Sequence, residues 1–177
     1  MIIGVPKEIK NNENRVAIIP EKAAILSKQN HNILIESNAG TAAGYPDKDY
    51  VNSGCTIISN VEEIYKNAEL ITKVKEPLES EYKYLNKKSI LFTFLHLAAN
   101  KNLVMNLLKS EMTSIAYEAI TKNGKTFPLL KPMSEIAGKL APQIAANFLQ
   151  KQYGGPGLLI GGTSNVKPLN ISIIGAG

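Results

Sequence analysis

Short apolar runs alternate with amphipathic stretches along the first 120 residues. The runs are rich in β-branched residues and are bounded by Gly, Pro, Asn and Asp, a pattern typical of buried strands. The expected strands cover residues 2–5, 31–37, 55–59, 69–74, 89–95 and 113–120. The expected helices cover residues 20–29, 48–54, 61–68, 80–86 and 100–110, with Asp47 and Asn60 as N-caps of the second and third helices.

Strands that alternate with helices at this spacing predict an α/β fold. We expect a mostly parallel, doubly wound, flavodoxin-like sheet with helices on both faces. In such sheets ligands bind outside the carboxyl ends of the strands. The residues that follow each apolar run are therefore the first candidates for a functional site.

A long helix is predicted beyond residue 128. Residues 134–155 carry apolar side chains at helical spacing, with Ser134 as the expected cap and Gly154 near the expected end. Pro142 lies inside this segment and should kink or break the helix.

Two shorter signals flank this helix. An Asn-Gly pair in residues 121–126 predicts a hairpin. Residues 171–174 form a strand-like run that leads into a G-x-G motif at Gly175 and Gly177, which we interpret as the start of a Rossmann domain. The motif alone is a weak signal, because the third glycine, the helix and the ribose-binding acid would lie beyond it. We expect residues 170–174 to have no sheet to join, and so to be disordered or to pair as an exposed edge.

Composition narrows the class of protein. The 177 residues are 44% hydrophobic and 20% charged, which is typical of a globular chain. The net charge of +5 comes from lysines scattered among acidic residues, which argues against a nucleic-acid-binding face. The single cysteine, Cys55, excludes an internal disulfide and is expected to be buried. The sequence contains neither a secretory signal nor a membrane-length apolar run, so we expect a cytoplasmic protein.

Two basic residues follow expected strands. Arg15 lies in the polar loop after the first strand, and a guanidinium can bind a carboxylate through two parallel hydrogen bonds. Lys75 ends the fourth strand and could polarise a carbonyl oxygen or hold a carboxylate. A solvated loop arginine and an ordinary strand-terminal lysine are the alternatives. Lys73 shares a strand face with Lys75 if the strand extends that far.

Further candidates lie at the same predicted edge. His96 ends the most apolar strand and could transfer protons near neutral pH, although a lone histidine beside an apolar run is often a core residue. Glu118 follows the sixth strand. His31 precedes its strand, so we interpret it as structural.

Several stretches of the chain resemble the amino-terminal part of the alanine dehydrogenase family. They are "MIIGVPKEIKNNENRVA", "ITKVKEPLESEY", "ILFTFLHLAA", "IAYE", "PMSEIAG" and "IIGAG", in the order and spacing of that family. The first stretch also resembles the alpha subunit of the proton-translocating nicotinamide nucleotide transhydrogenase. "FTFLHLAA" and "PLLKPMSEIAG" favour the dehydrogenase.

The resemblance implies NAD-dependent oxidative deamination of L-alanine to pyruvate and ammonium, and the reverse reaction. By motif position, it implies that Arg15 binds the substrate carboxylate. Lys75 would contact the pyruvate oxygens and polarise the carbonyl, and His96 would transfer the proton. The remaining implied roles are NAD contacts at Ser134, Gly175 and Gly177 and a weaker, metal-associated role at Glu118.

The resemblance also implies a domain division. Residues 1–132 would be a substrate domain that lacks its carboxy-terminal helices, and residues 133–177 a linker helix with the first strand of a truncated NAD-binding domain. Family members assemble as homohexamers. We expect this chain to be inactive alone, because most of the NAD-binding domain would be missing. The alternatives are a non-catalytic carboxylate-binding or oligomer-assembly fragment, or a transhydrogenase alpha-subunit-like domain.

Overall fold

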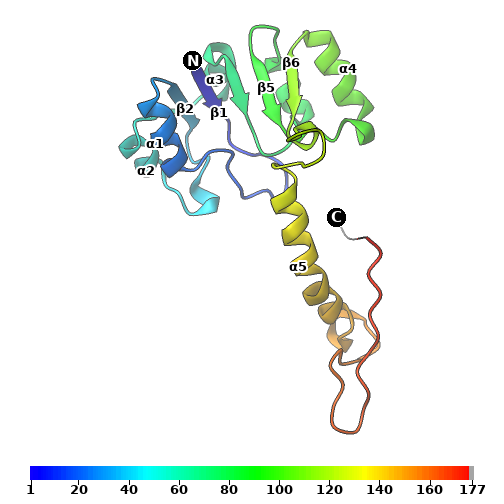
Figure 1. The fold of residues 1–177 in the computed structure, drawn as a ribbon. Helices are drawn as coiled ribbons and strands as arrows, with labels where there is room; N and C mark the ends of the chain where they lie inside the picture. Colours follow the sequence, from blue (N-terminus) through cyan, green and yellow to red (C-terminus); the bar gives the residue numbers. More distant parts are fainter. Residues whose placement is uncertain (176–177) are drawn as a thin grey trace. The chain divides into compact units, whose positions relative to one another are not determined.

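The computed structural model describes residues 1–175. These residues fall into two compact units, a first unit of residues 1–120 and a second unit that begins at Thr121. The first unit contains a six-stranded parallel sheet with the order β3-β2-β1-β4-β5-β6 (Figure 1). Its strands are β1 (Ile2–Val5), β2 (Asn32–Glu36), β3 (Thr56–Ile58), β4 (Leu70–Thr72), β5 (Ile90–Thr93) and β6 (Thr113–Ala116). The expected parallel, doubly wound α/β fold is confirmed. Its strand order is that of doubly wound dinucleotide-binding sheets rather than the flavodoxin-like order 2-1-3-4-5.

Helices pack on both faces of this sheet. They are α1 (Pro20–Lys28), α2 (Asp47–Asn52), α3 (Val61–Asn67) and α4 (Lys101–Ser110). Side chains alternate along each strand, so Ile3 and Val5 of β1 join a core with α1 and α2. Ile2, on the opposite face of β1, packs against the core that includes α3 and α4.

The glycine in β1 brings α3 close to the sheet. A Cβ atom at Gly4 would lie 2.5 Å from Ile64 in α3 and 2.9 Å from Ala68, which directly follows α3. Both residues belong to the core that includes α3 and α4. The glycine is therefore required by packing, because no side chain fits between β1 and the helix.

Several local expectations are settled by the hydrogen bonds. Asn60 caps α3, since its side-chain oxygen accepts from the Glu62 amide at 3.0 Å. Asp47 is the first residue of α2 rather than its cap; its carboxylate accepts instead from the Ser37 hydroxyl at 2.9 Å and the Asn38 amide at 2.8 Å. The Asp47 prediction was wrong because a long-range loop contact takes the carboxylate that would otherwise cap the helix.

Short 3₁₀ helices connect several elements of the first unit. They are η1 (Thr41–Ala43), η2 (Glu79–Tyr84), η3 (Leu97–Ala99) and η4 (Tyr117–Ala119). The helix expected over residues 80–86 is therefore a 3₁₀ helix, η2. η4 follows β6 directly and η3 begins four residues after the end of β5, so these two helices fix the course of the chain just beyond the strands.

The second unit is built on α5 (Lys131–Phe148), followed by η5 (Lys151–Tyr153). α5 begins three residues before Ser134, because Pro132 suits its first turn, so the expected cap at Ser134 was wrong. The helix runs through Pro142 without a break and ends at Phe148 rather than near Gly154. Gly154, with a φ of 79°, ends η5 instead.

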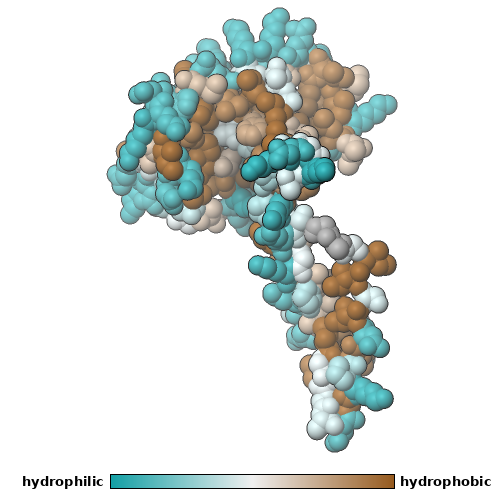
Figure 2. Space-filling model, in the orientation of Figure 1, coloured by the Kyte–Doolittle hydropathy of each residue, from teal (hydrophilic) through white to brown (hydrophobic). Residues whose placement is uncertain are grey.

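The two flanking signals have different outcomes. Lys122 and Thr126 form an isolated antiparallel bridge, which agrees with the expected hairpin. Among the described residues, 171–174 form no strand, because no neighbouring strand pairs with their backbone groups. Their hydrophobic side chains lie on the surface, with Ile173 69% exposed (Figure 2). Gly177 lies outside the described residues.

Candidate functional site

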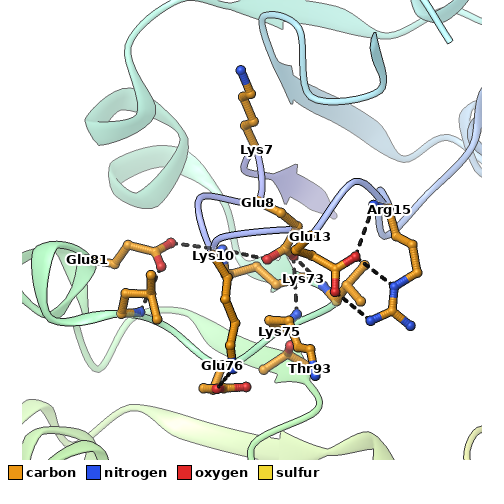
Figure 3. Close-up of polar contacts among 12 residues, drawn as sticks. Lys7, Glu8, Lys10, Glu13, Arg15, Lys73, Lys75, Glu76, Glu81 and Thr93 are labelled. Carbon is orange, nitrogen blue, oxygen red and sulfur yellow. Dashed lines mark hydrogen bonds and ion pairs between the residues drawn. The ribbon is translucent and has the colours of Figure 1, made fainter. Parts of the chain in front are cut away.

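The carboxyl ends of β1, β4, β5 and β6 lie side by side along one edge of the sheet. β2 and β3 are added on one side of β1, and the chain then returns to add β4, β5 and β6 on the other side. The strand order therefore reverses between β1 and β4, and doubly wound sheets bind ligands at such a reversal. Glu8, Glu13 and Arg15 follow β1, while Lys73, Lys75 and Glu76 follow β4 (Figure 3). The topology thus brings two charged segments, more than 50 residues apart in the chain, to the place where such sheets bind ligands.

A buried ion-pair network lies at the centre of this edge. The Lys73 side chain is fully buried, and its Nζ lies 2.9 Å from Glu81 Oε1 and 3.5 Å from Glu8 Oε2. The Tyr65 hydroxyl donates to Glu81 Oε1 at 2.9 Å. β4 ends at Thr72, so Lys73 does not extend the strand as a partner of Lys75.

Glu8 connects this network to Lys75. Its Oε1 accepts from the amides of Val74 at 2.5 Å and Lys75 at 3.3 Å (Figure 3). Burial raises the pKa of Glu8, although Lys73 and the two amides oppose the shift. A carboxylate from the loop after β1 therefore holds the backbone from which the Lys75 side chain extends.

The loop of residues 6–19 has two further anchors. The Lys7 amide donates to Glu36 Oε2 at 2.8 Å, and the Tyr50 hydroxyl donates to the Ile18 carbonyl at 3.0 Å. Burial raises the pKa of Tyr50 to about 12, so the hydroxyl keeps its proton at neutral pH. The loop that carries Arg15 is thus tied to β2 and α2.

Arg15 presents the two-pronged geometry expected from its chemistry. Its Nε and Nη2 donate to the two oxygens of Glu13 at 2.7 and 2.5 Å (Figure 3). The hydrogen bonds from Arg15 outweigh burial and lower the pKa of Glu13, and the charge of Lys75 lowers it further. A carboxylate therefore already lies in the guanidinium fork, within electrostatic reach of Lys75.

His96 follows β5 in an unusual backbone conformation. Its φ of 48° and ψ of 42° lie in the left-handed region. Glu118, which follows β6, accepts from the amides of His96 at 2.7 Å and Leu95 at 3.1 Å. Burial tends to raise the pKa of Glu118, but these backbone hydrogen bonds and that of its own amide outweigh burial and lower it.

Glu76 links His96 to the loop after β1. Its Oε1 accepts from Lys10 Nζ at 2.5 Å, and its Oε2 lies 3.5 Å from His96 Nδ1. Burial tends to raise the pKa of Glu76, but the hydrogen bond from Lys10, the amide of Glu76 itself and the charges of Lys10 and His96 outweigh burial and lower it. The edge therefore carries the imidazole of His96, the guanidinium of Arg15 and the buried ammonium of Lys73, each next to a carboxylate.

The other predicted site residues have different settings. Ser134 and Gly175 belong to the second unit. Ser134 helps to line a surface cavity of about 500 Å³ together with Lys125, Thr126, Phe127, Leu130, Lys131 and Glu135. Gly175 has a φ of 118°, which favours glycine. Within residues 1–175, no group of three or more His, Cys, Asp and Glu side chains is arranged to hold a metal ion. The Glu118 carboxylate accepts hydrogen bonds from backbone amides.

Sequence reasoning missed the carboxylates of this edge. Four of them were not identified as candidates: Glu8, Glu13, Glu76 and Glu81. Glu13 contacts Arg15, Glu76 contacts His96, and Glu8 and Glu81 contact the buried Lys73. Lys73 itself was considered only as a partner of Lys75. Each of these residues lies within ten positions of the end of β1 or β4. Proximity to a buried strand end was thus the signal that could have found them.

The fold and this edge define a doubly wound α/β domain whose carboxyl edge carries paired acidic and basic side chains. Residues 4–137 match the family described as "Alanine dehydrogenase/PNT, N-terminal domain". The chain belongs to this family. Across the described residues, no helix combines the length and apolar character needed to cross a membrane.

Individual relatives agree with this assignment. The chain is 48% identical to the alanine dehydrogenase of Bacillus subtilis and 46% identical to that of Staphylococcus saprophyticus, over all 177 residues. It covers 46% and 47% of these two proteins, so it spans about half the length of the curated relatives it matches.

Solved structures give the same picture. An L-alanine dehydrogenase matches 95% of this chain with a TM-score of 0.87 and 45% identity, and 46% of that protein is covered. A transhydrogenase from Sinorhizobium meliloti matches 84% of the chain with a TM-score of 0.73. At 23% identity over 45% of its own length, this second likeness shows the shared fold alone.

Proposed function

We propose that the carboxyl edge around Arg15, Lys75 and His96 is the substrate site of an L-alanine dehydrogenase. The observation that supports this best is the Glu13 carboxylate in the Arg15 fork, next to Lys75. A substrate carboxylate can make the same two hydrogen bonds once Glu13 moves aside. L-Alanine and pyruvate, the two substrates of that reaction, both carry such a group.

The neighbouring side chains suit the rest of a 2-oxo acid. Lys75 supplies a positive charge that binds and polarises the carbonyl oxygen of pyruvate. His96, exposed at the end of β5, takes up or returns the proton when the carbon–nitrogen bond is broken or formed. Each role requires only a group that already lies at this edge.

NAD is the proposed hydride acceptor in alanine deamination, and it supplies the redox chemistry when bound. Ser134, Gly175 and Gly177 are the proposed contacts by motif position. The positive φ of Gly175 suits a close turn. Residues 171–174, however, form no strand within the described structure that would lead into this turn. We therefore assign no step of the reaction to NAD on this chain, and we propose that the first unit binds the substrate.

Association with further copies is part of the proposal. Ile136, Leu140, Ile144 and Phe148 recur every four residues along α5 and are 42–68% exposed. Such a stripe supports a homo-oligomer, with a hexamer as the state proposed from the family. A cytoplasmic location is proposed on the same basis, and cell fractionation would test it.

Calorimetric titration with pyruvate tests the substrate site. We expect Arg15→Ala to weaken binding about 10- to 100-fold, because hydrogen bonds to a charged group are worth about 1.5–3 kcal/mol. Arg15→Lys keeps the charge but loses the fork, so it should restore only part of the affinity. The matched control is Lys22→Ala, which removes an exposed charge paired with Glu21. Equal pyruvate binding by the unmodified chain and Arg15→Ala would contradict the proposal.

Binding alone without turnover is the second candidate function. The absence of an ordered strand at residues 171–175, within the described part of the chain, favours it. NADH formation from L-alanine and NAD, measured beside the calorimetry, separates the two functions. Binding with turnover favours the dehydrogenase, whereas binding without turnover favours the carboxylate-binding module.

A further inference from the structure

Glu118 holds the backbone around His96. An L-residue rarely adopts the left-handed conformation that His96 has, so neighbouring contacts must maintain it. Both Glu118 oxygens accept hydrogen bonds from the Leu95 amide, at 3.1 and 3.2 Å. Oε1 also accepts a hydrogen bond from the His96 amide at 2.7 Å. A carboxylate on the neighbouring strand end thus fixes the direction in which the imidazole leaves the chain.

Glu76 faces one particular nitrogen of the His96 ring. Its Oε1 is bound to Lys10, whereas its Oε2 is buried and has no hydrogen-bond partner within the described residues. Buried carboxylate oxygens normally have a donor. The His96 Nδ1 atom lies 3.5 Å away, just beyond ordinary hydrogen-bond distance, and a small shift would let it donate to Oε2 if it carries a proton.

Lys10 keeps Glu76 in its charged form, because an ammonium beside a buried carboxylate stabilises the negative charge. A charged carboxylate can only accept a hydrogen bond. An imidazole that bonds to this oxygen through Nδ1 therefore has to present its N–H there, and a neutral histidine has only one N–H. Its other nitrogen, Nε2, then carries a lone pair.

From this arrangement we propose that Glu76 and Glu118 are positioning residues that hold neutral His96 as the Nδ1–H tautomer, with Nε2 as the proton-transferring atom. The tautomer follows from the contacts of Glu76. The transfer of a proton at Nε2 rests on the proposed function.

Nuclear magnetic resonance of the imidazole nitrogens tests this inference directly. The chain has two histidines, so the ring signals of His96 and His31 are easily assigned by mutation. At a pH where both rings are neutral, we expect His96 to show a protonated Nδ1 and an unprotonated Nε2. A His96 ring that is mainly Nε2–H in the unmodified chain would overturn the inference.

Glu76→Gln gives the sharpest comparison. The carboxamide oxygen should stay with Lys10, which turns the NH₂ group toward His96 Nδ1. A donor at this position favours the opposite tautomer, so the His96 signals should invert to Nε2–H. Glu62→Gln, on an exposed face of α3, is the matched control and should leave them unchanged. Unchanged His31 signals in Glu76→Gln show that the fold is intact, and an unchanged His96 tautomer there contradicts the role of Glu76.

Glu118→Ala tests the backbone clamp. We expect faster hydrogen exchange at the Leu95 and His96 amides, and broadened His96 ring signals, with His31 unaffected. Exchange rates equal to those of the unmodified chain would contradict the role of Glu118.

Pyruvate separates this inference from the proposed function. A shift of the Nε2 signal on addition of pyruvate supports both. If His96 is the Nδ1–H tautomer but its Nε2 signal does not shift on addition of pyruvate, the result supports Glu76 and Glu118 as positioning residues and counts against the proposed substrate site.

Discussion

Removal of the buried Lys73 charge gives a stringent test of the ion-pair network. In Lys73→Met, the methionine fills a similar volume, but Glu8 and Glu81 lose the cation that lies within 3.5 Å of both. Breaking a buried pair by deleting one partner costs about 3–5 kcal/mol, because the remaining charge stays desolvated. Domains of this kind have a total stability of about 5–15 kcal/mol, so the loss is a large fraction of the whole.

Urea unfolding followed by circular dichroism measures this loss. With a urea dependence of about 2 kcal/mol/M, the unfolding midpoint at pH 7 should fall by roughly 1.5–2.5 M. Lys87→Met is the matched control, because Lys87 makes an exposed pair with Glu111 and should cost less than about 1 kcal/mol. The neutral triple variant Glu8→Gln, Lys73→Met, Glu81→Gln should recover most of the loss, since it leaves no buried charge unpaired.

The loss should also depend on pH in a definite direction. Burial raises the pKa of Glu8, and Lys73 is the strongest factor opposing that shift, so deletion of Lys73 raises it further. A raised carboxyl pKa means that the protonated form is favoured in the folded state. The deficit of Lys73→Met should therefore be full at pH 7 and shrink as the pH falls toward about 4.5. A deficit below 1 kcal/mol at pH 7, or one that is equal at both pH values, would refute the reasoning.

Two further predictions concern the cores on the two faces of the sheet. Gly4→Ala should lower the free energy of unfolding by about 1–3 kcal/mol in urea titrations, because its Cβ would clash with Ile64 and Ala68; an unchanged midpoint would contradict the tight contact of α3 with β1. The Cys55 thiol is buried and its pKa is raised by burial, so it should react with Ellman's reagent at pH 8 much more slowly in the folded chain than in urea. Equal rates in the two states would mean that Cys55 is accessible.

Most strands were predictable because each is a short apolar run bounded by residues that end it. β1 has its predicted bounds, β2 is one residue shorter than predicted at each end, and α1 ends one residue before its predicted end. The side of β1 on which β4 pairs was not predictable, since an apolar run does not specify its neighbour. The turn chemistry of Asp47 was also hidden, because its partners Ser37 and Asn38 lie across a loop.

The second unit departed further from prediction for a physical reason. Ser134 and Pro142 are strong local signals, yet α5 begins before one and continues through the other. Residues 171–174, in contrast, agree with the expectation that this run has no sheet to join, because they have strand composition but adopt no strand within the described structure. A strand depends on hydrogen bonds to another strand, so composition alone does not create one.

The basic candidates were recognised, whereas their acidic partners were not, and electrostatics explains both outcomes. Arg15, Lys75 and His96 stood out because they follow apolar runs and have useful chemistry. Cations brought to one edge of a sheet repel one another and lose hydration, so the fold requires acids beside them. Within the described residues, this edge meets that requirement through acids that follow the two central strands, β1 and β4, or lie in η2. Glu8 and Glu13 follow β1, Glu76 follows β4 and Glu81 lies in η2.

A basic residue predicted at a buried strand end therefore implies an acid on a neighbouring strand end, and the position of that acid depends on strand order. For this reason Glu8 could be assigned to Lys73 only once β1 and β4 were known to be adjacent.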